Sequence, residues 1–444
     1  MNEQENTLLY GPVRAGLVRF ALPVILSMLA TQLYTVADTM VIGLRLDAAA
    51  LAAVSNASTV LMIFLFVSGG MELGGGLLLA AKRPTATREE LCAMTYNLLL
   101  IDGAIGLLMM ALGYGGIEQF LRWINTPAEI LPEAARYAWF YLPGLPCLML
   151  YDLAKQIVIG SGDSKTPLYA VLFTSVLNVG LDIVLVGPFG VAGAAAATAF
   201  SQLVGLVVML AHLRKTLLIQ PFRPGMLRPA LLWDIFRLSA PNAVQQASGP
   251  VVNLVKQGLL GTLGVAAIAG FSCASKLSTL LLMPVFGVAQ SLVFFIAQNT
   301  AAGQPDRVTE SLREARRLVL LYAALVVGGC VLFARPMLGL FTEDAGAVAF
   351  GALMLSRDAL AYPFTCLRHM QEARLRGAQK MGFYLISNLG VVALNLAACV
   401  ILVPRVGFDG FYLSSYISAP LGLLTAAALV RLSQKSPAPA PEST

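Results

Sequence analysis

Two acids, an amide and a hydroxyl lie inside apolar stretches in the first half of the chain. Asp38, Asp182 and Thr198 each lie about five to seven residues from one end of their stretch, and Asn178 precedes Asp182 by four residues. If the stretches are helices, these groups reach a similar depth, roughly 9 Å from one surface at 1.5 Å per residue. Hard oxygen ligands at one level suit Na⁺, and two carboxyl groups in an apolar site also suit a proton.

The two halves of the chain repeat each other with a shift of 217 or 218 residues. Pro23 recurs as Pro241, and Leu177-Asn178 recurs as Leu394-Asn395. Further matches in the same register are Gly43 with Gly261, Gly70 with Gly287, Pro146 with Pro363, Gly190 with Gly407 and Gly193 with Gly410. A duplicated membrane domain is typical of a transporter whose site lies between or within the repeats.

The acids do not repeat. At the positions of Asp38 and Asp182, the second half carries Lys256 and Cys399. The duplicated scaffold therefore does not require an acid at either position, and this favours ion chemistry in the first half alone.

The amide and the hydroxyl do repeat as polar residues. Asn178 is matched by Asn395, so a helix–helix hydrogen bond explains it about as well as ion binding does. Thr198 is matched by Ser415, and a small residue at a helix interface is the simpler interpretation of that position.

Three further charged residues inside apolar runs are candidates for a cavity. Glu72 lies in a Gly-rich stretch, 68–76, and either lines a cavity or extends to the nearer surface. Asp102 falls near the middle of its run, and Lys256 either lines a cavity or pairs with an acid of the other half. A charge at the bilayer centre costs roughly 2.5–3.5 kcal/mol on insertion scales, so each needs a reason to be there.

The composition indicates a polytopic membrane protein. The chain is 57% hydrophobic and 12% charged, against about 25% charged in soluble domains. Apolar runs long enough to cross a bilayer recur throughout, and lipid requires them to be helices. We predict an all-α membrane protein with twelve transmembrane helices, at 17–44, 51–81, 91–114, 136–158, 167–187, 191–213, 234–260, 265–297, 315–334, 349–374, 382–404 and 408–431.

The positive charges predict the topology. With both termini in the cytoplasm, 21 Lys and Arg residues lie in inner loops and tails and 5 in outer loops. This bias explains the excess of basic residues without nucleic acid. We expect an N-lobe at 1–213, a cytoplasmic linker at 214–233, a C-lobe at 234–433 and a disordered Pro-rich tail at 434–444.

Enzymatic and metal-binding motifs are missing from the sequence. Six scattered Cys without CxxC spacing and two His predict packing residues, not a metal site. No HExxH or nucleophile motif occurs. The spacing of Asn178 and Asp182 faintly resembles part of a prenyltransferase Mg²⁺ motif, but no span carries the second acidic cluster that such an enzyme needs. We therefore expect no enzyme and no cofactor.

Several motifs resemble those of multidrug and toxic compound extrusion (MATE) transporters. The stretch 36–43, VADTMVIG, with Pro23, is similar to the family's first span, and 160–167, GSGDSKTP, is similar to the loop between spans four and five. The pieces around 178–198 and 297–308 follow in family order. The resemblance covers nearly the whole chain.

The resemblance implies two six-helix lobes that form a V around a central cavity, in a cell-membrane protein that exports drugs or toxic organic cations against Na⁺ or H⁺. In one branch the ion site lies in the N-lobe, which carries over to Asp38, Asn178, Asp182 and Thr198, with Tyr137 a weaker match. Pro23 is then the hinge of the first span. A second branch has an essential acid in span seven, where this chain has Lys256. We expect small-molecule substrates and a monomer.

A lipid-linked oligosaccharide flippase of a related branch is the main alternative. Its cavity needs several basic residues facing a pyrophosphate. Here only Lys256, Lys276 and Arg368 could contribute.

Overall fold

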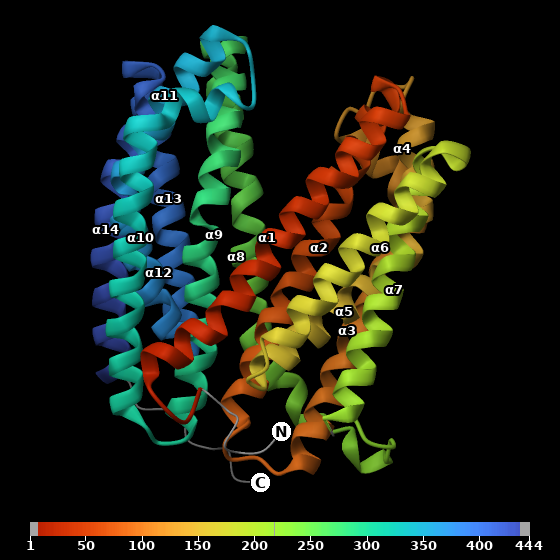
Figure 1. Cartoon of the computed structure of the whole chain (residues 1–444), viewed down its shortest axis with the longest axis vertical. Coiled ribbons are helices and arrows are strands. Elements are labelled where there is room, and N and C mark those ends of the chain that lie inside the picture. The colour runs from red at the N-terminus through yellow and green to blue at the C-terminus, as the bar shows by residue number, and fades with distance from the viewer. Residues whose placement is uncertain (1–7, 217, 436–444) are drawn as a thin grey trace. The chain divides into compact units, whose positions relative to one another are not determined.

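The chain is almost wholly helical. The computed structural model describes residues 8–216 and 218–435, and that part contains helices joined by short loops, without a β-strand (Figure 1). An all-α fold is therefore confirmed. Residues 436–444, most of the predicted tail, lie outside the described part.

The chain divides into two compact units. Unit 1 contains residues 1–10 and 22–246, and unit 2 contains 11–21 and 247–444. Two of the three boundaries fall inside helices, α1 (Val13–Arg45) and α8 (Ala230–Leu260), and the third lies just before α1. The predicted linker, 214–233, lies wholly within unit 1.

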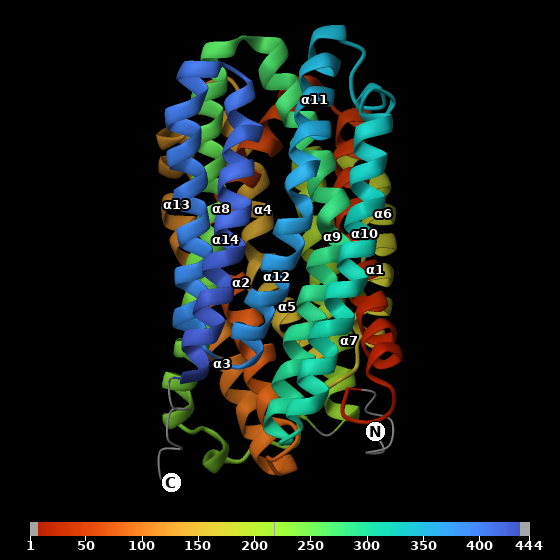
Figure 2. The same ribbon diagram turned by 90° about the vertical axis from the view of Figure 1, so that its left-hand side faces the viewer.

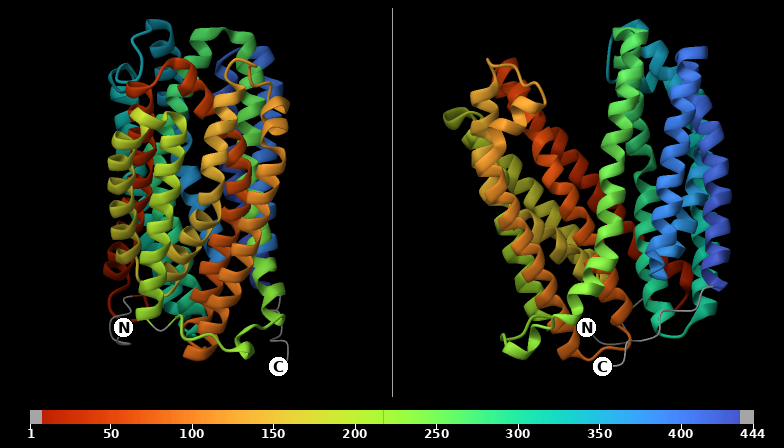
Figure 3. Two further views of the ribbon diagram at one scale, coloured as in Figure 1. Left: turned by 90° about the vertical axis from the view of Figure 1, so that its right-hand side faces the viewer. Right: turned by 180° about the vertical axis from the view of Figure 1, so that it is seen from behind.

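Unit 1 is built around α5 (Leu145–Gly160), on which α2 (Ala48–Lys82) and α3 (Arg88–Trp123) both pack (Figure 3). Its other elements are α4 (Leu131–Tyr141), η2 (Leu142–Gly144), α6 (Lys165–Phe189), α7 (Val191–Lys215) and η3 (Pro224–Met226). The Gly-rich stretch of α2 allows the close approach: a side-chain carbon at Gly76 would meet the backbone oxygen of Gln156 at 2.8 Å.

Unit 2 repeats this order of elements. In Figure 2 its α13 (Met381–Val406) and α14 (Asp409–Lys435) lie side by side, and they are in contact. The others are η4 (Gly261–Leu263), α9 (Val265–Ala301), α10 (Pro305–Gly339), α11 (Ala345–Asp358), η5 (Ala359–Ala361) and α12 (Tyr362–Gly377).

The two units share irregular features in one register. The break η2 between α4 and α5 recurs as η5 between α11 and α12, 217 residues later. Gly190, which ends α6, has φ 61°, and Gly407, which ends α13, has φ 66°. Only glycine adopts such a conformation without strain. The predicted duplication therefore reaches the caps of individual helices.

Ten helical segments are long and apolar enough to cross a membrane, counted over the described residues. The α4–η2–α5 run counts as one of them. The two remaining predicted spans coincide with α8 and with the run α11–η5–α12, which contains Arg357, Asp358, Arg368 and Glu372.

Candidate functional site

Two acids from different helices meet inside unit 1. The carboxyl groups of Asp38 on α1 and Asp182 on α6 are within hydrogen-bonding reach of each other. Each also has one buried oxygen without a hydrogen-bond partner in the described part of the chain. Two ionised carboxylates repel each other at this range, so the arrangement is stable when a proton or a cation sits between them.

An amide and a hydroxyl extend this acid pair. Turned to satisfy both of its ends, the Asn178 amide donates from its nitrogen to Asp182 Oδ2 at 2.8 Å and accepts at its oxygen from Thr198 Oγ1 at 3.2 Å. Asn178, Asp182 and Thr198 are all buried, at 2%, 0% and 5% exposure. The structure therefore brings together the four residues that the sequence grouped by depth.

Tyrosines surround the pair. Tyr34, one turn before Asp38 on α1, lines the same cavity as Thr198 and lies near both Thr198 and Asp38. The sequence interpretation missed this residue, although its i−4 spacing from Asp38 was a usable signal. Tyr137, the weaker match, lies close enough to Asp38 for the two side chains to interact electrostatically, and its hydroxyl lies near Ser58.

A cavity of about 250 Å³ opens beside this site, within unit 1. Asn178, Thr198 and Tyr34 line one part of it, and Glu72 and Lys155 line another. Because Asn178 bonds Asp182, the cavity reaches the acid pair through this amide. Glu72 therefore lines a cavity instead of extending to the surface.

A second group of charges lies near the other part of the cavity. Lys155 pairs with Asp152, three residues earlier on α5. Glu72 accepts a hydrogen bond of 3.0 Å from Ser68 on its own helix. Asp102 on α3 is completely buried.

The equivalent region of unit 2 keeps the amide and loses the acid. Asn395 on α13 donates to Ser414 and Ser418 on α14, at 3.3 and 3.0 Å. Cys399, in the position of Asp182, contacts Ser414 Oγ at 3.0 Å. Asn395 thus has the helix–helix role that was one interpretation of Asn178.

Lys256 lies near an acid of its own unit. It acts electrostatically on Asp358 of α11, whose side chain lies near that of Ser415. Ser415 is the repeat counterpart of Thr198, and Lys256 is the counterpart of Asp38. The second unit therefore supplies a tethered ammonium group where the first has an acid.

Another buried ion pair occupies α12. Arg368 donates to Glu372 at 2.5 Å, and Ser387 donates to the same carboxylate at 3.0 Å. Arg368 and Glu372 are 8% and 3% exposed. The guanidinium is thus already neutralised inside unit 2.

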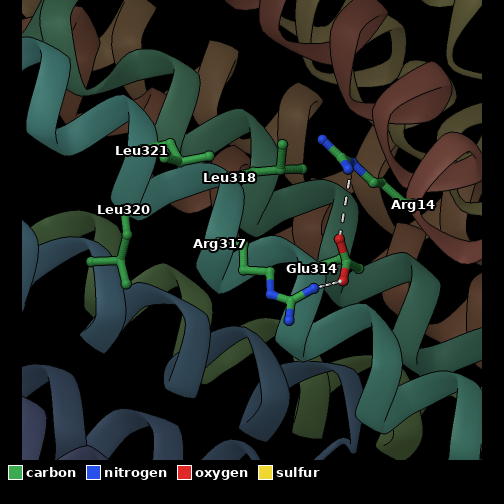
Figure 4. Close-up of a pocket in the computed structure, with 6 residues that line it drawn as sticks. All are labelled: Arg14, Glu314, Arg317, Leu318, Leu320 and Leu321. Atoms are coloured by element: carbon green, nitrogen blue, oxygen red, sulfur yellow. Dashed lines mark hydrogen bonds and ion pairs between the residues drawn. The ribbon is translucent and has the colours of Figure 1, made fainter.

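The first turns of α1 attach to unit 2. Arg14 lies 4.0 Å from Glu314 of α10, which also pairs with Arg317 (Figure 4). Arg307 donates to the backbone oxygen of Gly11 at 2.8 Å. Arg14, Glu314 and Arg317 line an open pocket of about 410 Å³ together with three leucines. Pro23 lies two residues after the point at which α1 passes from unit 2 to unit 1.

The loop between α5 and α6 is fixed by one acid. Asp163 accepts from the backbone nitrogens of Lys165 and Thr166 at 3.0 and 3.1 Å, and His212 lies 3.4 Å away. Partial burial opposes ionisation of Asp163, but hydrogen bonds from His212 and Thr166 outweigh it and lower its pKa from 3.8 to about 2. This acid caps α6 and is separate from the acid pair.

A duplicated helical membrane protein with buried acids beside a cavity is typical of membrane transporters. Comparison with known families agrees. The MatE family model matches residues 23–184 and again 241–401, one match in each half. The chain belongs to the MatE family and is a multi-pass membrane transporter, not an enzyme. The lipid II flippase MurJ model also matches, over residues 131–239.

Individual proteins support the assignment. A protein of Shewanella oneidensis named FAD transporter is 29% identical over 77% of each chain. The probable multidrug resistance protein NorM of Thermotoga maritima is 24% identical, over 82% of this chain and 80% of its own. A mutant of the Vibrio cholerae MATE transporter VcmN superposes with a TM-score of 0.90 at 17% identity, over 96% of this chain and 98% of that one. The likeness to VcmN shows the fold.

Proposed function

We propose that this chain is a cation-coupled antiporter that exports small organic molecules, with its coupling ion bound at Asp38 and Asp182. The contact between these two carboxyl groups is the observation that carries the proposal. It joins α1 to α6, so occupancy by an ion favours helix positions that an empty, doubly charged pair disfavours. Both termini would face the cytoplasm, and the chain would work as a monomer in the cell membrane.

The donor set accepts either a proton or Na⁺. Asp38, Asp182, Thr198 and the Asn178 amide all offer oxygen atoms, the ligand type that hard cations prefer. The close approach of two carboxyl groups favours the proton, because a shared proton removes their repulsion without further ligands.

The substrate would occupy the cavity beside the acid pair. Its volume, about 250 Å³, is near the lower end of the range for small-molecule pockets. Tyr34 and Tyr141 offer aromatic faces, and Asp152 and Glu72 offer negative charge. These features suit cationic substrates. Several relatives are named multidrug resistance or multidrug export proteins, which supports drugs as the substrate class.

Coupling would pass through α1. Its first turns are tied to unit 2 through Arg14 and Arg307, whereas Asp38 lies in unit 1. Proline removes a backbone hydrogen bond and weakens the helix at that point. Pro23, beside the division between the units, is therefore the proposed hinge.

A second candidate is export of an anionic solute such as a dinucleotide. The relative named FAD transporter favours it, whereas Lys155, the lysine that lines the cavity, is paired with Asp152. The flippase alternative is weaker, because Arg368, one of its three candidate basic residues, is already paired with Glu372.

Everted membrane vesicles test the proposal. The variant Asp38→Asn keeps the shape of the side chain and removes its charge. Ion-driven uptake of a fluorescent organic cation should therefore fall to the level of vesicles that lack the transporter. Glu118→Gln, which removes an exposed acid from α3, is the matched control and should behave as wild type. Uptake by Asp38→Asn at the wild-type rate would contradict coupling at the acid pair.

A further inference from the structure

A junction of three helices in unit 1 gathers charges away from the acid pair. At Gly75 of α2, a side-chain carbon would lie 2.7 Å from Leu153 of α5 and 3.0 Å from Leu98 of α3. Glu72 precedes Gly75 by three residues, Asp152 adjoins Leu153, and Asp102 follows Leu98 by four. Each acid therefore lies within about one helical turn of the same junction.

Asp102 is the unusual member of this group. Its residue has no exposed surface, and neither carboxyl oxygen has a hydrogen-bond partner in the described part of the chain. An ionised carboxylate buried without donors costs several kcal/mol. Its nearest charged influences are Asp152 and Glu72, which carry the same sign and increase that cost.

The charges of the cluster do not balance. Glu72, Asp102 and Asp152 provide three carboxyl groups, and Lys155 is the one ammonium group that acts on them. Lys155 is committed to Asp152 by a direct ion pair. The remaining groups that face the cluster, Tyr141 and Tyr151, are neutral phenols and add no positive charge.

Water can deliver protons to this cluster. Glu72, Asp152 and Lys155 line the cavity, and Asp102 lies behind them in the packed interior. A proton from cavity water can therefore add to a carboxylate oxygen of Glu72 and pass on to Asp102, while Asp152 stays paired with Lys155. On release it returns to cavity water by the same groups.

We propose that Glu72, Asp102 and Asp152 form a second proton-binding site in unit 1, distinct from the Asp38–Asp182 pair. The site takes up one O–H proton on a carboxylate while Lys155 stays an ammonium ion bound to Asp152. It shares the cavity with the acid pair, so substrate in that cavity contacts both sites.

The duplicated scaffold does not require this cluster. The repeat counterparts of Glu72 and Asp102 are Ala289 and Val319, both buried and apolar. The counterparts of Asp152 and Lys155 are His369 and Glu372. Unit 2 folds without an acid at any of the three equivalent positions. The shared fold therefore does not explain the three acids of unit 1.

Infrared titration of the full chain in lipid nanodiscs tests the site directly. The carbonyl stretch of a protonated carboxyl group is separate from that of a carboxylate, so the band area counts bound protons during a pH titration. Asp102→Asn should remove about one carboxyl equivalent from this band. Glu72→Gln should shift the midpoint of the part that remains, and Glu118→Gln should remove nothing that titrates as a buried acid.

The outcomes separate this site from the proposed antiport. Asp38→Asn should remove a different component of the band, and the loss should add to that of Asp102→Asn in the double variant. A band in Asp102→Asn and in Glu72→Gln that matches wild type in area and midpoint would overturn the second site, whatever Asp38→Asn shows. The infrared titration counts bound protons and does not depend on transport. The second proton-binding site can therefore be correct even if the antiport proposal fails.

Discussion

Unit 1 and unit 2 share a helix–helix hydrogen bond made by an asparagine, but they differ in the residue one turn away. In both, an asparagine on one helix bonds a hydroxyl on the next: Asn178 with Thr198, and Asn395 with Ser414. One turn along, unit 1 has Asp182 and unit 2 has Cys399. The amide is thus part of the scaffold, and the acid is an addition to it.

The first helix of each unit shows the same contrast. Asp38 meets a second acid, whereas its counterpart Lys256 acts on Asp358 and lowers the electrostatic cost of that carboxylate. A tethered ammonium group cannot leave, so unit 2 carries a fixed cation where unit 1 needs a mobile one. The comparison explains why we assign ion exchange to unit 1.

The largest expected effect comes from giving unit 1 the residue of unit 2. Asp182→Cys should fold, because Cys399 packs in the equivalent place, but ion-driven export should fall by about 5- to 150-fold, the usual size of a coupling free energy. Cys399→Ser is the matched control and should export normally, since a hydroxyl also bonds Ser414. Export assays in vesicles measure this effect. Export by Asp182→Cys at the wild-type rate would show that ion coupling does not need the acid at position 182.

A smaller effect should separate the two asparagines. Asn178→Ala and Asn395→Ala each remove a helix–helix hydrogen bond, so both should lose about 1 kcal/mol of stability. Only Asn178→Ala should weaken binding of the coupling ion, because only Asn178 bonds an acid. Thermal unfolding and ion-dependent stabilisation can be measured on the same samples. Equal loss of ion binding in both variants would contradict the contrast.

Lys256→Gln should affect stability more than transport. Removing the ammonium group takes away the cation that acts on Asp358, at a cost of about 1 kcal/mol for a half-buried pair. Lys276→Gln, which removes an exposed lysine from α9, should change the melting temperature little. If Lys256→Gln abolished coupled export and kept its stability, unit 2 would hold part of the ion site.

The smallest effect concerns the loop acid. Asp163 has a folded pKa of about 2, below its ordinary 3.8, so its stabilising contribution is complete above about pH 4 and is lost as pH falls through about 2. Asp163→Asn should lower stability by about 1 kcal/mol, as for a lost helix cap. The difference from wild type should shrink as pH falls from about 4 to about 2. A difference that stays the same over this range in thermal unfolding would refute this view of Asp163.

The sequence predicted most of the scaffold for physical reasons. Apolar runs of sufficient length predicted the helices, and the register of prolines and glycines predicted the duplication down to Gly190 and Gly407. It also grouped Asp38, Asn178, Asp182 and Thr198, because helical rise converts sequence position into depth. Depth carries no information about rotation, so the surroundings of Asp102 required the packed structure.

The points at which α1 and α8 pass between the units also escaped prediction. A long apolar helix has the same pattern on both sides of Pro23, and only contacts such as Arg14 with Glu314 show which unit holds each part. The polar segment 214–233 was a plausible boundary, but it packs on unit 1, where Asn97 donates to the backbone oxygen of Met226 at 2.8 Å.

Ion flux induced by substrate, measured in proteoliposomes with a proton gradient and a Na⁺ gradient imposed separately, tests the central claim most directly. Wild type should move the coupling ion in the direction opposite to substrate under one of the two gradients, and the double variant Asp38→Asn with Asp182→Asn should move none. Substrate-induced ion flux that persists in the double variant would show that the ion crosses elsewhere and would contradict the assignment of ion exchange to unit 1.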